Sequence, residues 1–180
     1  MKEVWKHLKF IATYPKLGPD MYFTHWLLFF KPIRLWYQKR ILKERIGKNS
    51  EIRPYSILSG YNNIVIGENV IIPEGVRLVT DPSDNKKIII GNSVLFGPNV
   101  AIYATTHSFQ NPQIPIKDQP LRNAQTVIKS GCWIGINVVI LPGVTIGCNS
   151  VIAANSVVTR DIPDNVVAGG CPAKIIKPCS

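Results

Sequence analysis

The sequence predicts an all-β solenoid, in which short parallel strands stack in successive coils around a narrow core. Large aliphatic residues recur every six positions at Ile134, Ile140, Ile146 and Ile152, and Val158 takes the next position. Gly or Ala usually follows the aliphatic residue, and a small or β-branched residue stands fifth in each hexad. A period of six fits neither a helix nor a simple alternating strand, but it suits short strands joined by tight bends.

The same phase extends toward the N-terminus and predicts a repeat over residues 46–163. Its earlier large apolar positions are Ile46, Ile52, Leu58, Ile66, Ile72, Leu78, Ile90, Phe96 and Ile102. The phase breaks around residues 81–87 and again in a polar, Pro-containing insertion at residues 103–127. Breaks in a repeat are where functional residues gather. Residues 164–180 are expected to form a C-terminal tail.

The first 45 residues are predicted to form a separate basic, aromatic-rich helical segment. Eleven Lys and Arg but only three Asp and Glu precede residue 49, so most of the net charge of +10 lies there. Pro32 opens a stretch that predicts an amphipathic helix, with cations toward one side and apolar residues at roughly helical spacing on the other; the apolar residues are Ile33, Trp36, Tyr37, Ile41 and Leu42. Two roles stay open for this segment: covering the edge of the first coil, or contact with an anionic membrane. Nucleic acid is not expected as a partner, because no recognised binding motif is present.

The sequence indicates one domain in the cytoplasm, and contact with the inner face of the cytoplasmic membrane stays open. Lysines interrupt the first twenty residues, so they lack the apolar core of a secretory signal. The apolar stretch at residues 21–30 is too short to cross a bilayer. The cysteines form no CxxC pair and are expected to be reduced thiols; they are Cys132, Cys148, Cys171 and Cys179.

His107 is the one histidine outside the N-terminal segment, and it stands at the root of the second insertion. It is therefore the sole conventional acid/base candidate of the repeat at neutral pH. A lone histidine is more often structural than catalytic. Its position, where a loop leaves a repetitive scaffold, favours the catalytic interpretation.

Four blocks in this order, FGPNVAIYATTHSF, CWIGINVVILPGVTIG, SVVTRDIP and GGCPAKII, accompany the hexads. Together they resemble the hexapeptide-repeat acyltransferases, most closely the sugar and surface-polysaccharide O-acetyltransferases of the maltose/galactoside type. The resemblance covers roughly the last two-thirds of the chain. It implies a left-handed parallel β-helix, acetyl-CoA as acyl donor, and a homotrimer whose acyl sites lie between neighbouring chains.

The resemblance also implies the roles of three residues in the reaction. His107 would take the proton from an acceptor hydroxyl as it attacks the thioester directly, without an acyl-enzyme, a contribution of about 10² to 10⁴ in rate. The backbone N–H of Ile136 would stabilise the oxyanion. Asn99 would help hold the acceptor, although a turn residue is its alternative interpretation.

The donor site implied by the resemblance is a groove for CoA, and no metal is expected. Its residues would be Trp133 against the CoA moiety, Ala154 through its backbone, Thr159, Arg160, and Lys174 and Lys177 near the phosphates. A corner side chain is the alternative role for Trp133, and the two lysines are also ordinary surface cations. A zinc site built on three histidines cannot be assembled from His107 alone within the repeat.

The insertion carries IPIKDQPL, a pattern more like enzymes that acetylate bacterial surface polysaccharides than like those acting on small galactosides. With the basic N-terminus it favours a sugar or lipid-linked saccharide as acceptor. The sequence departs from the family at two places. Some sugar acetyltransferases have a polar residue at the position of Ile136, and many relatives read GAGS at the position of residues 153–156. Two alternatives stay open: an enzyme similar to serine acetyltransferases, which normally have a longer helical N-terminal domain, and a non-enzymatic scaffold docked at a membrane.

Overall fold

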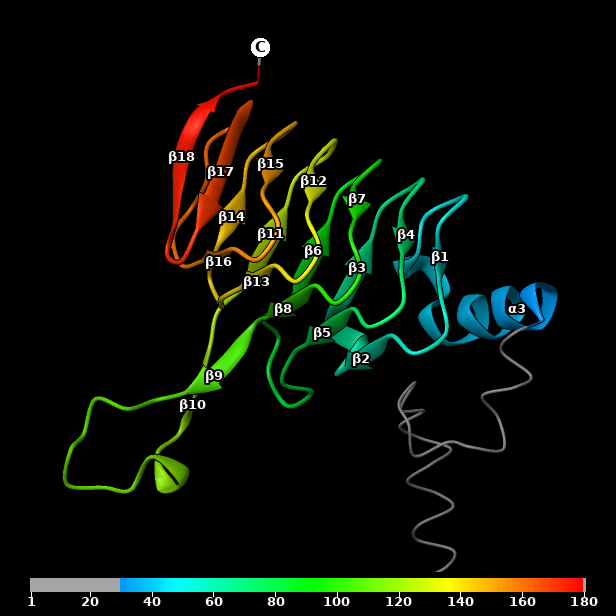
Figure 1. Cartoon of the computed structure of the whole chain (residues 1–180). Helices are drawn as coiled ribbons and strands as arrows, with labels where there is room; N and C mark the ends of the chain where they lie inside the picture. The colour runs from blue at the N-terminus through cyan, green and yellow to red at the C-terminus, as the bar shows by residue number, and fades with distance from the viewer. Residues whose placement is uncertain (1–29, 180) are drawn as a thin grey trace, which may run out of the picture.

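The computed structural model describes residues 30–179 and confirms the predicted β-solenoid. Short parallel strands stack in coils, and each coil passes through three sheets in a fixed order (Figure 1). We call these sheet 1, sheet 2 and sheet 3 in chain order, and name each corner by the two sheets that it joins. Trp133 pairs with Val151 and Val139 with Val157, so an uninterrupted coil takes 18 residues.

The strands are short, and most have two or three residues. Sheet 1 contains β1 (Glu51–Ile52), β4 (Ile71–Ile72), β7 (Leu95–Phe96), β12 (Trp133–Ile134), β15 (Val151–Ile152), β17 (Val166–Gly170) and β18 (Ala173–Pro178). Sheet 2 contains β2 (Ile57–Ser59), β5 (Arg77–Val79), β8 (Ala101–Tyr103), β13 (Val139–Ile140) and β16 (Val157–Val158). Sheet 3 contains β3 (Ile64–Ile66), β6 (Ile88–Ile90), β11 (Thr126–Ile128) and β14 (Thr145–Ile146).

The hexad aliphatic residues form the core, because each points inward from the last position of a strand or close to it. Ile134, Ile140, Ile146 and Ile152 are fully buried, as the six-residue period predicted. Burying one such side chain contributes about 1.5–3 kcal/mol relative to leaving it in water. The core therefore runs as one column along the axis of the solenoid.

Asparagines shape the corners. Seven take positive φ angles between 53° and 59°, a conformation that Asn tolerates better than most residues; they are Asn49, Asn69, Asn99, Asn137, Asn149, Asn155 and Asn165. Asn137 donates a hydrogen bond from Nδ2 to Oδ1 of Asn155, 3.0 Å away on the next coil. Stacked turns of this kind hold successive coils in register.

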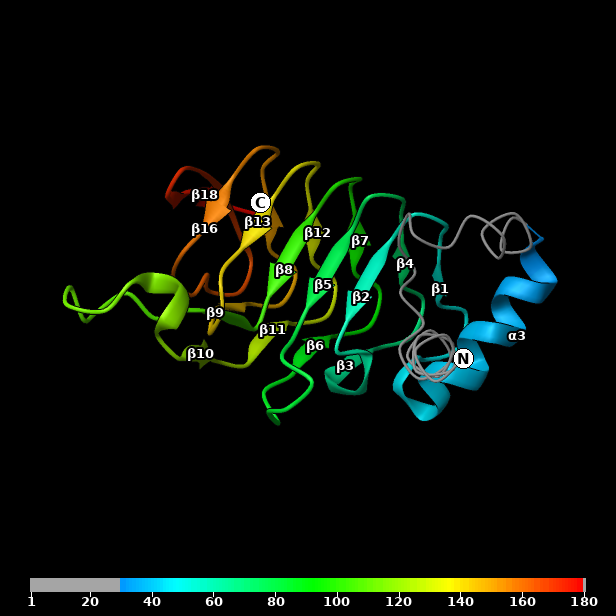
Figure 2. The same ribbon diagram turned by 90° about the horizontal axis from the view of Figure 1, so that it is seen from below.

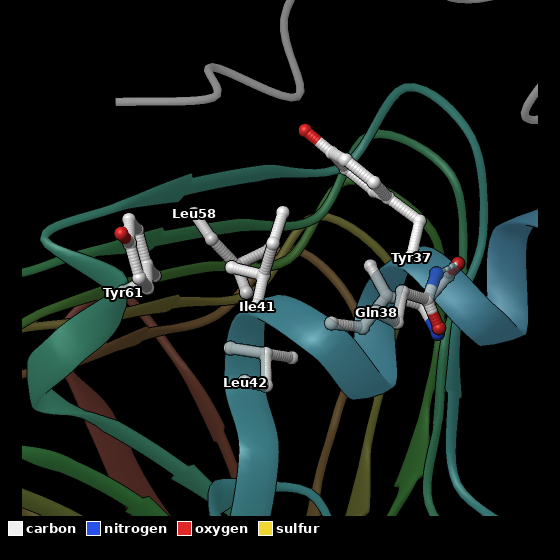
Figure 3. Close-up of a pocket in the computed structure, with 7 residues that line it drawn as sticks. Tyr37, Gln38, Ile41, Leu42, Leu58 and Tyr61 are labelled. Atoms are coloured by element: carbon white, nitrogen blue, oxygen red, sulfur yellow. Dashed lines mark hydrogen bonds between the residues drawn. The ribbon is translucent and has the colours of Figure 1, made fainter. Parts of the chain in front are cut away.

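Helix α3 (Lys31–Leu42) and the short helix η2 (Lys43–Arg45) cover the first coil. The side chain of Gln38 is hydrogen-bonded to both the N–H and the C=O of Ile52, so it occupies the free edge of β1. Figure 3 shows Ile41 and Leu42 on the side of the helix that meets Leu58. This supports the covering role for residues 31–45. Among the described residues, no helix has the length and apolar character needed to span a bilayer.

The predicted apolar stripe of α3 is confirmed at Ile41 and Leu42 but wrong at Ile33 and Trp36. Leu42 is buried, but Ile33 is 43% and Trp36 61% exposed, while the polar Gln38 is buried. The reason is that Gln38 satisfies backbone groups of β1, which requires its face, rather than that of Trp36, to meet the solenoid. The outer face of α3 is therefore both aromatic and basic.

At the other end, residues predicted as a tail continue the fold. β17 adds to sheet 1 beside β15, and β18 returns antiparallel to β17 as the edge strand. The opposite ends of the stack are thus occupied by α3 and β18 (Figure 1).

Candidate active site

Both phase breaks leave the solenoid at corner 2–3, in consecutive coils. The first lies between β5 and β6, and the second between β8 and β11. The second contains a hairpin of β9 (Thr105–His107) and β10 (Leu121–Asn123), followed outward by a loop with the helix η4 (Ile116–Asp118). This hairpin projects from the body of the solenoid (Figures 1 and 2). The sequence located the two breaks, but not the fact that they are neighbours in space.

His107 is the last residue of β9 and is exposed to solvent. In the hairpin Thr105 pairs with Asn123 and His107 with Leu121, so these four side chains share one face. The Ser108 N–H donates to the C=O of Pro120 at 3.0 Å and continues the ladder past His107. No hydrogen bond to the imidazole is found among the described residues. The ring is therefore accessible to a substrate hydroxyl.

Asn123 joins the hairpin to the first insertion. Its Nδ2 donates to Oδ2 of Asp81 at 2.9 Å and to Oδ2 of Asp84 at 3.2 Å. Asn63, in helix η3 (Tyr61–Asn63) at the same corner, donates to the backbone C=O groups of Asp81 and Asp84 at 2.9 and 2.7 Å. Three successive coils are thereby linked at the base of the His107 hairpin.

Both carboxylates are stabilised in the ionised form. Hydrogen bonds from the side chain and backbone of Ser83, and then from Asn123, lower the pKa of Asp81. The Lys86 backbone N–H, followed by Asn123, lowers the pKa of Asp84. Sequence reasoning missed this cluster. The sequence feature that could have indicated it is the Asp-containing phase break at residues 81–87, one coil before the break that carries His107.

Two polar atoms near His107 lack a partner in the structure. Thr105 Oγ1 and Asn123 Oδ1 are both buried without a hydrogen bond, and they belong to the same rung of the hairpin. A buried polar atom without a partner is costly unless a water or a ligand satisfies it. This rung therefore has hydrogen-bonding capacity left, two residues before the candidate base.

Trp133 lies on the outer face of sheet 1 and is 53% exposed. Its neighbours across the sheet are Leu95 and Val151, and Ile71 follows Leu95. Leu95 and Ile71 are also exposed. The result is an outward apolar row, a feature that needs a partner or ligand to explain it.

Ile136 and Ala154 occupy the same position of corner 1–2 in successive coils. Neither backbone N–H donates to an acceptor among the described residues. A Cβ on Gly97 would lie 2.5 Å from the nitrogen of Ile136, so glycine at this position leaves room for that amide. Asn99 is at the same corner with φ 58°, and its side chain packs over Gly75. That placement fits the turn interpretation, and a role of Asn99 with the acceptor stays a prediction.

The predicted donor-site residues lie in two places. Thr159 and Arg160 directly follow β16, so they are exposed at corner 2–3, on the same edge as the His107 hairpin. Lys177 pairs with Val167 in the row that contains Trp133 and Val151. Lys174, opposite Gly169, is exposed nearby on β18.

Sheet 2 separates the two groups within one chain. The His107 hairpin leaves from the end of sheet 2 at corner 2–3, whereas Ile136 lies before the start of sheet 2 at corner 1–2. One chain therefore does not bring His107 and Trp133 together. A second copy, presenting its sheet 1 to the hairpin edge, could do so.

Comparisons with known proteins identify the family of this solenoid. The family model "Bacterial transferase hexapeptide (six repeats)" matches residues 125–160. The galactoside O-acetyltransferase of Escherichia coli (strain K12) is 36% identical over 154 residues, covering 81% of this chain and 70% of that protein. The chain belongs to the hexapeptide-repeat acetyltransferases.

Two further relatives widen the comparison. A putative lipopolysaccharide biosynthesis O-acetyl transferase of the same strain is 37% identical over 125 residues, which are 66% of this acetyltransferase and 62% of the relative. The crystal structure of a hexapeptide-repeat acetyltransferase from Vibrio cholerae O1 biovar eltor, complexed with acetyl coenzyme A, has a TM-score of 0.72 and 33% identity. That alignment covers 84% of this chain and 79% of that chain. The chain thus spans about two thirds of the length of its sequence relatives, and its β-helix is left-handed as in this family.

The cysteines of this acetyltransferase are free, and Cys132 is buried. Burial raises the pKa of the Cys132 thiol, and its Sγ is 2.9 Å from the C=O of Gly147. A buried protonated thiol is a poor nucleophile. Within residues 30–179 no group of three or more His, Cys, Asp or Glu side chains could hold a metal ion.

Proposed function

We propose that this acetyltransferase moves the acetyl group of acetyl-CoA to a hydroxyl of a sugar, with His107 as general base. The observation that carries the proposal is the exposed His107 imidazole on a braced hairpin at one edge of the solenoid. The Vibrio cholerae relative was crystallised with acetyl coenzyme A, which supports the choice of donor.

The reaction would proceed by direct attack. As the acceptor oxygen bonds to the thioester carbon, its proton passes to the His107 imidazole. The carbonyl oxygen becomes an oxyanion and accepts a hydrogen bond from the Ile136 N–H. Collapse of the tetrahedral intermediate breaks the C–S bond, and the departing CoA thiolate takes the proton from the imidazolium. This direct route needs no acyl-cysteine, and Cys132 in particular is buried.

The donor would lie between two chains. Thr159 and Arg160 would contact it from the edge that bears His107, while Trp133 and the Ala154 backbone would contact it from sheet 1 of the neighbour. Lys174 and Lys177 would sit near the CoA phosphates as point charges. Each of these predicted donor-site residues is exposed in the single chain, so each is accessible to a donor bound between two chains.

Such a site requires an oligomer, and we propose the homotrimer typical of the family. The exposed row of Ile71, Leu95 and Trp133 then faces the hairpin edge of the next chain. Three identical interfaces close a ring, because each chain contributes one hairpin edge and one sheet 1.

The acceptor we propose is a saccharide of a bacterial surface polysaccharide or its lipid-linked precursor. The likeness to a putative lipopolysaccharide biosynthesis enzyme supports this class. The loop beyond His107 also exposes Phe109 and Ile116, which offer apolar contact beside the acceptor. A lipid-linked acceptor would place the enzyme in the cytoplasm at the inner face of the membrane.

Calorimetric titration with acetyl-CoA tests the function without knowledge of the acceptor. We expect saturable binding that weakens in Trp133→Ala and persists in His107→Ala. Trp36→Ala is the matched control, since Trp36 is similarly exposed but lies on α3 at the far end of the solenoid. Absence of acetyl-CoA binding by the wild-type protein would favour a scaffold instead.

A further inference from the structure

A basic hollow lies at the N-terminal end of the solenoid, and none of its lining residues belongs to the candidate active site. It has a volume of about 410 Å³ and opens between α3, η2 and η3. Its lining residues are Tyr37, Arg40, Ile41, Lys43, Arg45, Tyr61 and Asn62, so it has three cations and no Asp or Glu. Figure 3 shows Ile41 between Tyr37 and Tyr61 at this end of the molecule.

Within residues 30–179, no carboxylate forms an ion pair with the cations of the hollow. Of the ion pairs among the described residues, none involves Arg40, Lys43 or Arg45. Arg45 donates from Nη2 to Oδ1 of Asn62 at 3.1 Å and to the C=O of Ile41 at 3.4 Å. These acceptors are uncharged, so they orient the guanidinium without cancelling its charge.

Neutral donors accompany the charges. Burial, and then the neighbouring Tyr61, raise the pKa of Tyr37, so its phenol stays protonated at neutral pH and can donate a hydrogen bond. The guanidinium carbon of Arg40, at the rim of the hollow, lies 5.6 Å from the centre of the Trp36 ring, within the range of a cation–π contact. Cations together with hydroxyl donors are the chemistry that recognises a phosphate.

A structural role for these charges does not account for their number. Lys39 and Arg40 in the last turn of α3 do complement the helix dipole. Residues 39–48, however, contain five cations and one carboxylate, and a second hollow shares Lys43 and adds Lys39 and Lys48. The dipole interaction falls off within one turn, so most of this charge has no partner in the part of the chain that the structure describes.

The apolar surroundings indicate the source of the phosphate. Phe30, Ile33 and Trp36 are exposed at 56%, 43% and 61% on or beside the same helix. A soluble phosphate ligand would not require exposed Trp and Phe next to its site, whereas the interface of a bilayer favours them beside cations. We propose that this hollow binds the phosphate of an anionic lipid headgroup and docks the enzyme on the membrane.

Docking here would serve the proposed acceptor class. The helix η3, which lines the hollow, is at corner 2–3 of the first coil, and the His107 hairpin leaves the same corner two coils later. At about 4.8 Å between neighbouring strands, the two levels are roughly 10 Å apart along the axis. Saccharides carried by membrane lipids would then be presented along the edge that bears the candidate base. This last step rests on the proposed function, but the docking itself does not.

Co-sedimentation with vesicles tests the docking. The full-length protein is mixed with phosphatidylcholine vesicles that contain or lack phosphatidylglycerol, and no CoA is present. We expect binding that requires phosphatidylglycerol and weakens in the double variant Arg40→Gln/Lys43→Gln. Two cations at about 1 kcal/mol each correspond to a roughly 30-fold lower partition coefficient.

Three controls make the test specific. Lys86→Gln/Lys87→Gln removes the same charge from the first insertion, and its vesicle binding should stay within a few-fold of that of the wild type. Arg40→Lys/Lys43→Arg keeps the charge of the hollow and should therefore keep vesicle binding. Lys9→Gln/Lys16→Gln reports on the N-terminal residues. Equal loss in the Lys86/Lys87 variant, loss confined to the Lys9/Lys16 variant, or binding independent of phosphatidylglycerol would each overturn the proposal.

Two further measurements separate this proposal from others. Pyrophosphate titrated by calorimetry without vesicles should bind weakly; tight binding of pyrophosphate with no vesicle binding would overturn the lipid assignment in favour of a soluble ligand. Acetyl-CoA affinity should be unchanged in Arg40→Gln/Lys43→Gln. Failure of acetyl-CoA to bind any variant would contradict the proposed function while leaving the vesicle result as it stands.

Discussion

The amide of Asn123, on the hairpin that carries His107, donates to Asp81 of the preceding coil over 2.9 Å. Asp84 accepts from the same nitrogen, so two ionised side chains hold one amide in place. The pairing partner of Asn123 is Thr105, two residues before His107. The position of the candidate base is therefore set from outside its own hairpin.

We predict that Asn123→Ala lowers kcat about 10- to 100-fold, because a displacement near 1 Å of a catalytic group can cost that much. The KM for acetyl-CoA should change little, since Asn123 lies outside the predicted donor groove. Asn123→Asp should be worse, as it sets a third carboxylate against Asp81 and Asp84. Steady-state kinetics with both substrates varied would measure this. If kcat is unaffected while only thermal stability falls, Asn123 has no positioning role.

The same hydrogen bonds predict a dependence of stability on pH. A carboxyl whose pKa is lower in the folded state than in the unfolded state stabilises the fold at pH values above the unfolded pKa of about 3.9. This stabilisation is lost as the pH falls through the pKa of the folded state. The Tm difference between wild type and Asn123→Ala should thus be constant near neutrality and shrink below about pH 4. A difference that grows on acidification would contradict the assigned ionisation of Asp81 and Asp84.

Gly97→Ala is predicted to impair the oxyanion donor. The added Cβ would lie 2.5 Å from the Ile136 nitrogen and must displace that amide. Removal of one oxyanion donor typically costs about 10² to 10³ in kcat. Gly47→Ala is a matched control, because its Cβ would approach the backbone of Gly67 to 2.5 Å at the far end of the solenoid. Equal loss of activity in both variants would point to general destabilisation.

Ile140→Ala should destabilise the fold by about 2–5 kcal/mol, because the side chain is fully buried and its removal leaves a cavity in the column of core residues. Ile140→Val, which removes one methylene, should cost only about 0.5–1.5 kcal/mol. Urea unfolding of both variants would measure the two values. Similar small losses for the two would mean that the neighbouring coils collapse into the space.

The periodicity was enough to predict the solenoid, because a single repeated environment recurs through Ile134, Ile140, Ile146 and Ile152. It also located His107, since a histidine at a break in the repeat can be recognised from the sequence alone. The Asn123–Asp81 link could not be predicted, because it depends on two insertions leaving the same corner in consecutive coils. Gln38 was missed for a related reason: the helical pattern ranks side chains by polarity, whereas the free edge of β1 requires a polar group.

In the proposed trimer, each active site combines His107 of one chain with Trp133 of another. This sharing is tested most directly by unfolding and refolding a mixture of His107→Ala and Trp133→Ala chains and measuring acetyl transfer. Assayed with acetyl-CoA well below the KM of the Trp133→Ala variant, each variant alone should have little activity. The mixed trimers should regain a substantial fraction of wild-type activity, because some sites receive both intact residues. If the mixture, shown to contain mixed oligomers, remains as inactive as the separate variants, the site is not shared between chains.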